Sequence, residues 1–141
     1  QGSGACSAIA AKLALQHPVR VVGVVSSHAT TYADSLAAGH VVEAPVTTQL
    51  ADGMACRVAD AEALAVMAPH IDHIVQVSDD EVAAAMRAIF TDTHNVAEGA
   101  GAAALAAALQ ERDALQGQNV GLALTGGNVD APMFANTLAM H

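Results

Sequence analysis

Residues 71–86 read IDHIVQVSDDEVAAAM, and this stretch decides the fold class. Residues 71–77 are rich in β-branched side chains and predict a strand. Ser78 and Glu81 then have the spacing of a capping box, in which each side chain accepts a hydrogen bond from the backbone N–H of the other. Apolar residues continue at helical spacing. The stretch therefore predicts a strand that passes directly into a helix, as in layered α/β proteins.

The same alternation continues in both directions along the chain. The run RVVGVV at residues 20–25 is nearly all apolar, which is typical of a strand covered on both faces in a parallel sheet. Further strands are predicted at 40–46 (a short edge strand) and 119–124, and helices at 5–16, 29–38, 60–67, 102–112 and 132–140. We therefore expect an α/β fold: an open, twisted, mainly parallel sheet flanked by helices, without an internal domain boundary.

Composition narrows the class of protein. The chain has 141 residues, is 53% hydrophobic and 2% aromatic, and has a formal net charge of −9. Its length is that of one domain or part of one. Few aromatic and basic residues argue against a nucleic-acid partner. The longest apolar stretch, 100–109, is shorter than the roughly 20 residues needed to span a bilayer, so no membrane partner is expected. Cys6 and Cys56 show neither a CxxC nor a zinc spacing, so a reducing, cytoplasmic setting is the default expectation.

Two glycine-rich loops mark where ligand chemistry is expected. Residues 2–4 (GSG) open a predicted helix, where free N–H groups and the helix dipole favour anions such as phosphate. Residues 125–128 (TGGN) follow the strand predicted at 119–124, at the sheet edge where open α/β sheets bind ligands. The first loop does not complete a dinucleotide-binding fingerprint, because Ser7 stands where a glycine or alanine is needed, and the chain contains no P-loop sequence.

Taken in order, the motifs resemble those of the fold-type II pyridoxal-phosphate enzymes. They are QGSGA at 1–5, SLAAG at 35–39 with LADG at 50–53, VQVSDDEVAAAM at 75–86, EGAGA at 98–102 and LTGGNVD at 124–130. The first resembles the phosphate-binding glycine loop of that superfamily. Within the superfamily the chain looks most like the threonine dehydratase and serine racemase branch, and its EGAGA form is similar to that of threonine dehydratases. The resemblance extends from residue 1 to about residue 130.

The resemblance implies pyridoxal 5'-phosphate as cofactor and gives roles to particular residues. Glu98 would lie near the cofactor ring as the catalytic candidate, and Thr125 would lie against the pyridine nitrogen. The remaining cofactor-binding candidates are backbone positions, at the phosphate (Gly2, Ser3, Gly4 and Ala5) and beside the imine region (Gly53).

Departures from the pattern matter as well. Gln1 and Ser3 stand where the family has glycines. Ser26 and Tyr32 stand where the branch has acidic cation ligands, so no metal site is predicted. The family's Schiff-base lysine lies upstream of the glycine loop, and Lys12 is interpreted as a solvated helix residue. Residues 1–141 are therefore expected to be the C-terminal part of the pyridoxal-phosphate-binding catalytic domain, starting at its phosphate loop.

The implied activity is that of an ammonia-lyase. The intact protein would convert a small β-hydroxy amino acid, such as threonine or serine, to a 2-oxo acid and ammonia by α,β-elimination, and the resemblance implies a homodimer. Two alternatives stay open: an amino-acid racemase of the same branch, and a non-catalytic fragment that binds a phosphate or the cofactor. The isolated chain is expected to be inactive.

Overall fold

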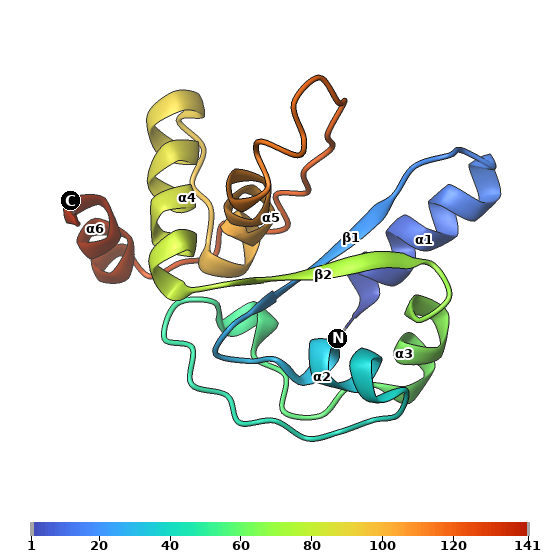
Figure 1. The fold of residues 1–141 in the computed structure, drawn as a ribbon. Helices are drawn as coiled ribbons and strands as arrows, with labels where there is room; N and C mark the ends of the chain where they lie inside the picture. The colour runs from blue at the N-terminus through green and yellow to red at the C-terminus, as the bar shows by residue number, and fades with distance from the viewer. Residues whose placement is uncertain (1, 141) are drawn as a thin grey trace.

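A computed structural model of the chain describes residues 2–140. The elements alternate as the sequence predicts (Figure 1). In chain order they are α1 (Ser3–Leu15), β1 (Val21–Ser26), α2 (Thr31–Ala38), the 3-10 turn η1 (Asp52–Met54), α3 (Ala61–Met67), β2 (Ile71–Val77), α4 (Asp79–Thr93), α5 (Gly99–Gln110) and α6 (Ala131–Ala139). No helix in this part of the chain is long and apolar enough to cross a membrane.

The sheet of the described residues is two-stranded and parallel. Val24 pairs with Val75 and Ser26 with Val77, and the register shifts by an irregularity between Val21 and Gly23. Helices flank the sheet, so the predicted α/β fold with a parallel sheet is confirmed.

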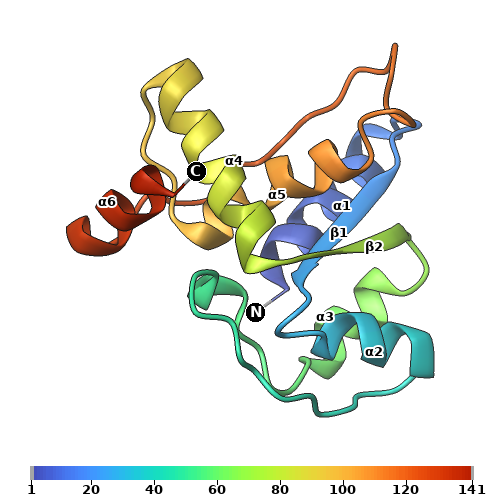
Figure 2. The same ribbon diagram turned by 60° about the vertical axis from the view of Figure 1, so that its left-hand side comes forward.

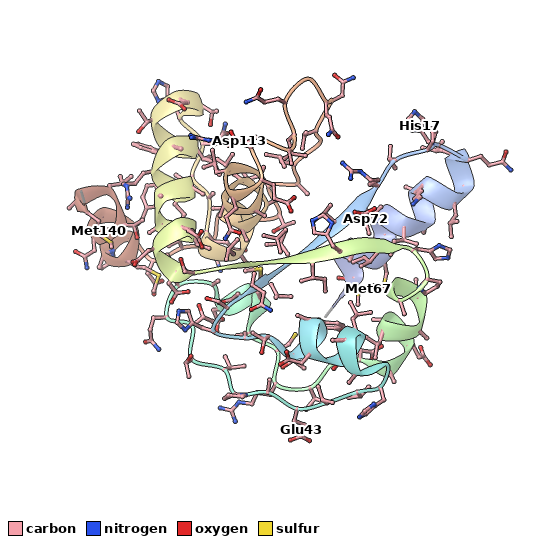
Figure 3. The ribbon with its side chains drawn as sticks, in the orientation of Figure 1. His17, Glu43, Met67, Asp72, Asp113 and Met140 are labelled. Atoms are coloured by element: carbon pink, nitrogen blue, oxygen red, sulfur yellow. The ribbon has the colours of Figure 1, made fainter. Side chains whose placement is uncertain are left out.

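The sheet separates two apolar cores. On one face, Val22 and Val24 pack with α4 and α5, whose buried residues are mostly alanine, so these helices approach closely. On the other face, Val21 and Val25 pack with α1, α2 and α3 around the buried Ile9 and Met67. Figure 3 shows Met67 between α3 and β2. Both faces of β1 are covered, which explains its continuous apolar sequence.

Local caps set several boundaries where the sequence predicts them. The Ser78 side chain accepts a hydrogen bond from the Glu81 N–H and the Glu81 carboxylate accepts one from the Ser78 N–H, so the capping box is confirmed. The bond from the Ser78 backbone lowers the pKa of Glu81 below its usual value. Asp60 caps α3 by accepting from the Ala63 N–H at 2.8 Å. Gly39 ends α2 at a φ of 73°, a left-handed conformation that favours glycine.

Three local expectations need correction. Residues 40–46 form no strand, only one antiparallel bridge between Glu43 and Val58. Helix α5 begins at Gly99, earlier than the expected Ala102.

The third correction is the strand predicted at 119–124, which the structure shows as chain without regular secondary structure or a strand partner among the described residues. Its apolar side chains are exposed: Val120 by 47%, Leu122 by 46% and Leu124 by 47%. A strand exists only when a neighbour accepts its backbone hydrogen bonds, so β propensity alone could not make one here.

Candidate functional site

Two helix starts lie near the end of the sheet where both strands finish. Helix α1 runs back along β1, so its start lies near the carboxyl end of that strand (Figures 1 and 2). The Ser27 N–H donates to the Val77 carbonyl at 2.8 Å, and this bond joins the carboxyl ends of the two strands. Helix α4 starts directly after β2. This is the edge at which open α/β sheets bind ligands.

The first glycine loop leaves several donors available. Gly2 has a φ of 85° and precedes α1, and the first helical hydrogen bond runs from the Cys6 N–H to the Gly2 carbonyl at 3.0 Å. The N–H groups of Ser3, Gly4 and Ala5 therefore have no helical acceptor. Ser3 and Gly4 are exposed, and the first turn contains no acidic residue. A Cβ added at Gly4 would meet no atom within 4 Å, so there is room above the loop.

A tyrosine from another helix supports this loop. A Cβ built at Gly2 would lie 2.9 Å from the Tyr32 Oη and 3.1 Å from the Ala63 Cβ. Tyr32 is only 8% exposed, and its hydroxyl accepts a hydrogen bond from the Asp60 N–H at 3.2 Å. Burial raises the pKa of the Tyr32 phenol above its usual value, so the phenol stays protonated.

The second glycine loop packs against the start of α5. The Glu98 N–H donates to the Gly126 carbonyl at 3.0 Å, and the half-buried Glu98 carboxylate lies where a side chain on Gly126 would be. Glu98 precedes α5 without making a capping hydrogen bond. On the other side, Gly101 lies directly against the Gly126 carbonyl. Only glycine fits at position 101, because backbone atoms of Gly126 occupy the space of its Cβ.

Gly53 joins the same cluster. A Cβ built there would lie 2.8 Å from the Ala100 Cβ, so η1 packs on the first turn of α5. The preceding loop is tied to α4 because Asp79 accepts from the Thr48 hydroxyl at 2.6 Å and from the Gln49 N–H at 2.8 Å.

The structure thus brings some predicted residues together and leaves others apart. Gly53 and Glu98 lie with the loop of the exposed Thr125 around the start of α5. The loop of residues 2–5 has different neighbours, Tyr32 and Ala63. Sequence reasoning missed the supporting roles of Tyr32 and Asp79. The available signal for Tyr32 was that it is the single tyrosine of an aromatic-poor chain.

No group of three or more His, Cys, Asp or Glu side chains within residues 2–140 is arranged to hold a metal ion. The buried Ser26 hydroxyl accepts a hydrogen bond from the His28 N–H at 3.1 Å instead. Burial raises the pKa of the Cys56 thiol above its usual value.

The sequence profile of the family described as "Pyridoxal-phosphate dependent enzyme" matches residues 1–126. The chain belongs to this family. It is 37% identical over 131 residues to the L-threonine ammonia-lyase of Geobacter sulfurreducens, covering 92% of this chain and 32% of that protein. The chain therefore spans about a third of the length of this curated relative.

Solved structures agree with this assignment. The crystal structure of a threonine deaminase from T.th. has a TM-score of 0.82 and 33% identity, covering 92% of this chain and 43% of that one. The structure of maize serine racemase has a TM-score of 0.81 and 25% identity, covering 94% of this chain and 42% of that one. The fold is that of fold-type II pyridoxal-phosphate enzymes, as the motifs predicted.

The residues present fit a phosphorylated pyridine cofactor. Open N–H groups at the positive end of α1 suit a phosphate dianion, with no carboxylate in the first turn to repel it. By contrast, the start of α4 is occupied by its own capping box and three acidic residues, Asp79, Asp80 and Glu81. Of these two helix starts, only that of α1 is built to accept an anion.

Proposed function

We propose that this chain is the C-terminal part of the catalytic domain of a pyridoxal-phosphate-dependent ammonia-lyase. The intact protein would convert a small β-hydroxy amino acid, such as threonine, to a 2-oxo acid and ammonia. The observation that carries the proposal is the open helix start at residues 2–5, near the carboxyl end of β1 (Figure 1), where the N–H groups of residues 3–5 have no helical acceptor. The 37% identity to an L-threonine ammonia-lyase supports the choice of reaction.

The first loop holds the phosphate in this proposal. The backbone N–H groups of Ser3, Gly4 and Ala5 donate to phosphate oxygens, as does the Ser3 hydroxyl. Gly2 has a left-handed φ of 85°, which glycine adopts without strain, and this conformation turns the chain into α1. Charge-assisted bonds of this kind anchor the cofactor independently of its reacting end.

The second loop and Gly53 hold the ring. When bound, pyridoxal phosphate supplies the electron sink for the substrate carbanion. In this proposal the Thr125 hydroxyl would donate to the pyridine nitrogen, which would stay uncharged and form a milder electron sink that suits loss of a β-hydroxyl as water. Glu98 is the catalytic candidate beside the ring, because its carboxylate lies over Gly126, next to Thr125. Gly53 would lie beside the imine region of the cofactor.

The rest of the site belongs, in this proposal, to an upstream part of the same protein that supplies the Schiff-base lysine. The chain's span of about a third of its curated relative supports this division. So does the exposed apolar segment 120–124, which has the composition of a strand and no partner among the described residues. We further propose a homodimer in the cytoplasm, where a reducing environment keeps Cys6 and Cys56 as thiols.

A racemase of the same branch is the second candidate. It is favoured by the TM-score of 0.81 to maize serine racemase at 25% identity. Incubation of the intact protein with one enantiomer of serine or threonine separates the two. A 2-oxo acid identifies elimination, and the opposite enantiomer, detected by chiral chromatography, identifies racemisation.

The first test of the proposal is spectroscopic. The intact protein with pyridoxal phosphate is expected to show a visible band that borohydride abolishes, with the mass of a lysine adduct outside residues 1–141. Thr125→Ala should shift the band and lower turnover about tenfold, the cost of one lost hydrogen bond to a reacting group, while Thr125→Ser retains both. An unchanged spectrum and rate in Thr125→Ala would remove Thr125 from the site. The absence of any cofactor band would overturn the proposed function.

A further inference from the structure

The start of α1 is the meeting point of three helices. Tyr32 lies in the first turn of α2, and its hydroxyl accepts from the Asp60 N–H at 3.2 Å. Asp60 in turn caps α3 by accepting from the Ala63 N–H at 2.8 Å. The Tyr32 hydroxyl and the Ala63 side chain both lie next to Gly2. A Cβ built at Gly2 would come within 2.9 Å of the hydroxyl and 3.1 Å of the Ala63 Cβ.

Each of these partners is fixed by contacts of its own. Tyr32 is 8% exposed and belongs to the apolar cluster of Ile9, Val25 and Met67. Its neighbour Thr31 is fully buried and donates to the Cys56 carbonyl at 2.6 Å. The Cys6 thiol of α1 lies 3.8 Å from the Ala63 carbonyl as its hydrogen-bond acceptor. The phenol tip therefore has little freedom to move away from Gly2.

We propose that Tyr32 is a positioning residue for the phosphate loop, acting through its hydroxyl to fix the backbone at Gly2 against the start of α3. This inference rests on the proposed cofactor site and deepens it. The hydroxyl accepts from the Asp60 N–H on one side, and on the other it occupies the space that a side chain at Gly2 would need. Because the N–H groups of residues 3–5 follow directly after Gly2, their direction depends on that contact.

The consequence is selective for the phosphate end of the cofactor. A loop that loses its support presents the same donors in a wider range of directions, which weakens binding of the phosphate but leaves the ring contacts at Thr125 unchanged. Tyr32→Phe removes the hydroxyl and keeps the ring, so the packing against Ile9 and Met67 remains. The Asp60 N–H then loses one acceptor.

The test uses the intact protein and compares pyridoxal phosphate with pyridoxal, which lacks the phosphate. Tyr32→Phe is expected to weaken the affinity for pyridoxal phosphate about 3- to 10-fold, the range of one net hydrogen bond, and to leave the affinity for pyridoxal unchanged. The ³¹P resonance of bound cofactor should also shift or broaden. Ser35→Ala is the matched control, since Ser35 is a fully buried α2 hydroxyl that bonds to Val42 and not to the loop.

The outcomes separate the two proposals. Equal loss of affinity for both ligands, or a loss matched by Ser35→Ala, would show that Tyr32 only stabilises the fold and would overturn its positioning role. An unchanged affinity and ³¹P spectrum in Tyr32→Phe would overturn it as well. If the unsubstituted protein binds neither ligand, the proposed cofactor site is wrong, and the positioning role of Tyr32 is then wrong as well.

Discussion

The glycine loop at residues 2–4 and the glycine loop at residues 126–127 both lie at helix starts, yet their glycines meet different physical demands. At Gly2 the demand is conformational, since a φ of 85° turns the chain into α1. At Gly126 and Gly127 it is spatial, because the Glu98 carboxylate and the Val96 carbonyl occupy the space of a side chain. The first loop is open above Gly4, whereas the second is packed against α5 on two sides.

The comparison teaches that a glycine pattern alone does not say what the glycines do. An open loop leaves N–H groups for a ligand, as at residues 3–5. A packed loop has already used its backbone, as the bond from the Glu98 N–H to the Gly126 carbonyl shows. The side chain of Thr125 is then the exposed group that the second loop presents.

The largest expected effect comes from disturbing the packed loop. In Gly101→Ala, the new Cβ would meet the Gly126 carbonyl, so we expect destabilisation of about 2–3 kcal/mol although alanine favours a helix. The melting temperature of the intact apoprotein measures it. Gly4→Ala is the matched control at the open loop, with no atom within 4 Å, and should be neutral or stabilising by up to about 1 kcal/mol. An equal melting temperature for both variants would remove the distinction between the loops.

A smaller effect is expected at the loop that joins Gly53 to α4. Asp79→Asn weakens the bonds from the Thr48 hydroxyl and the Gln49 N–H, at a cost of about 1 kcal/mol. Hydrogen exchange at residues 49–53 should accelerate, while the exchange rates at residues 2–6 stay as they are in the unsubstituted protein. Asp80→Asn is the control, because Asp80 lies in the same first turn of α4 and makes neither of these bonds. Faster exchange at residues 2–6 as well as at residues 49–53 would contradict the independence of the two loops.

The smallest effect concerns the segment that leads to the second loop. His73 on β2 lies between Asp72, at 2.8 Å from its Nδ1, and Glu111, at 2.7 Å from its Nε2. Arg20 faces the same group, 4.0 Å from Asp72 and bonded to Gln118 at 3.1 Å. Figure 3 places Asp72 toward the start of β2, away from α4. The cluster ties the chain after α5 to the sheet.

The pH dependence of that cluster follows from its charges. The hydrogen bonds to Asp72 and then Glu111 raise the pKa of His73, while His73 lowers the pKa of Asp72. The stabilisation by His73 is therefore complete below its ordinary pKa of about 6.5 and is lost as pH rises through the raised value. His73→Gln should lower the melting temperature at pH 6 by about 1–2 °C, the scale of an exposed pair, and leave it unchanged at pH 9. His17→Gln serves as control, and a deficit that persists at pH 9 would contradict the charge mechanism.

Much of the fold was predictable because its signals are local. The capping box at Ser78, the Asp60 cap and the glycine at the end of α2 all act within one helical turn, and each lies where the sequence places it. The apolar runs of β1 and β2 were equally clear. The strand predicted at 119–124 was wrong for the described chain, since a strand needs a neighbour that residue-by-residue reading does not supply.

The sequence by itself determined where most helices and the strands β1 and β2 lie, and the family, because spacing, caps and ordered motifs are written in neighbouring residues. Only the tertiary structure decided that Tyr32 faces Gly2, that Glu98 lies over Gly126 and that Asp79 holds the loop before Gly53. The physical reason is that these contacts join residues far apart in the chain, where side-chain packing between helices sets the distances. Helix and strand propensities describe single residues and carry no information about contacts between distant residues.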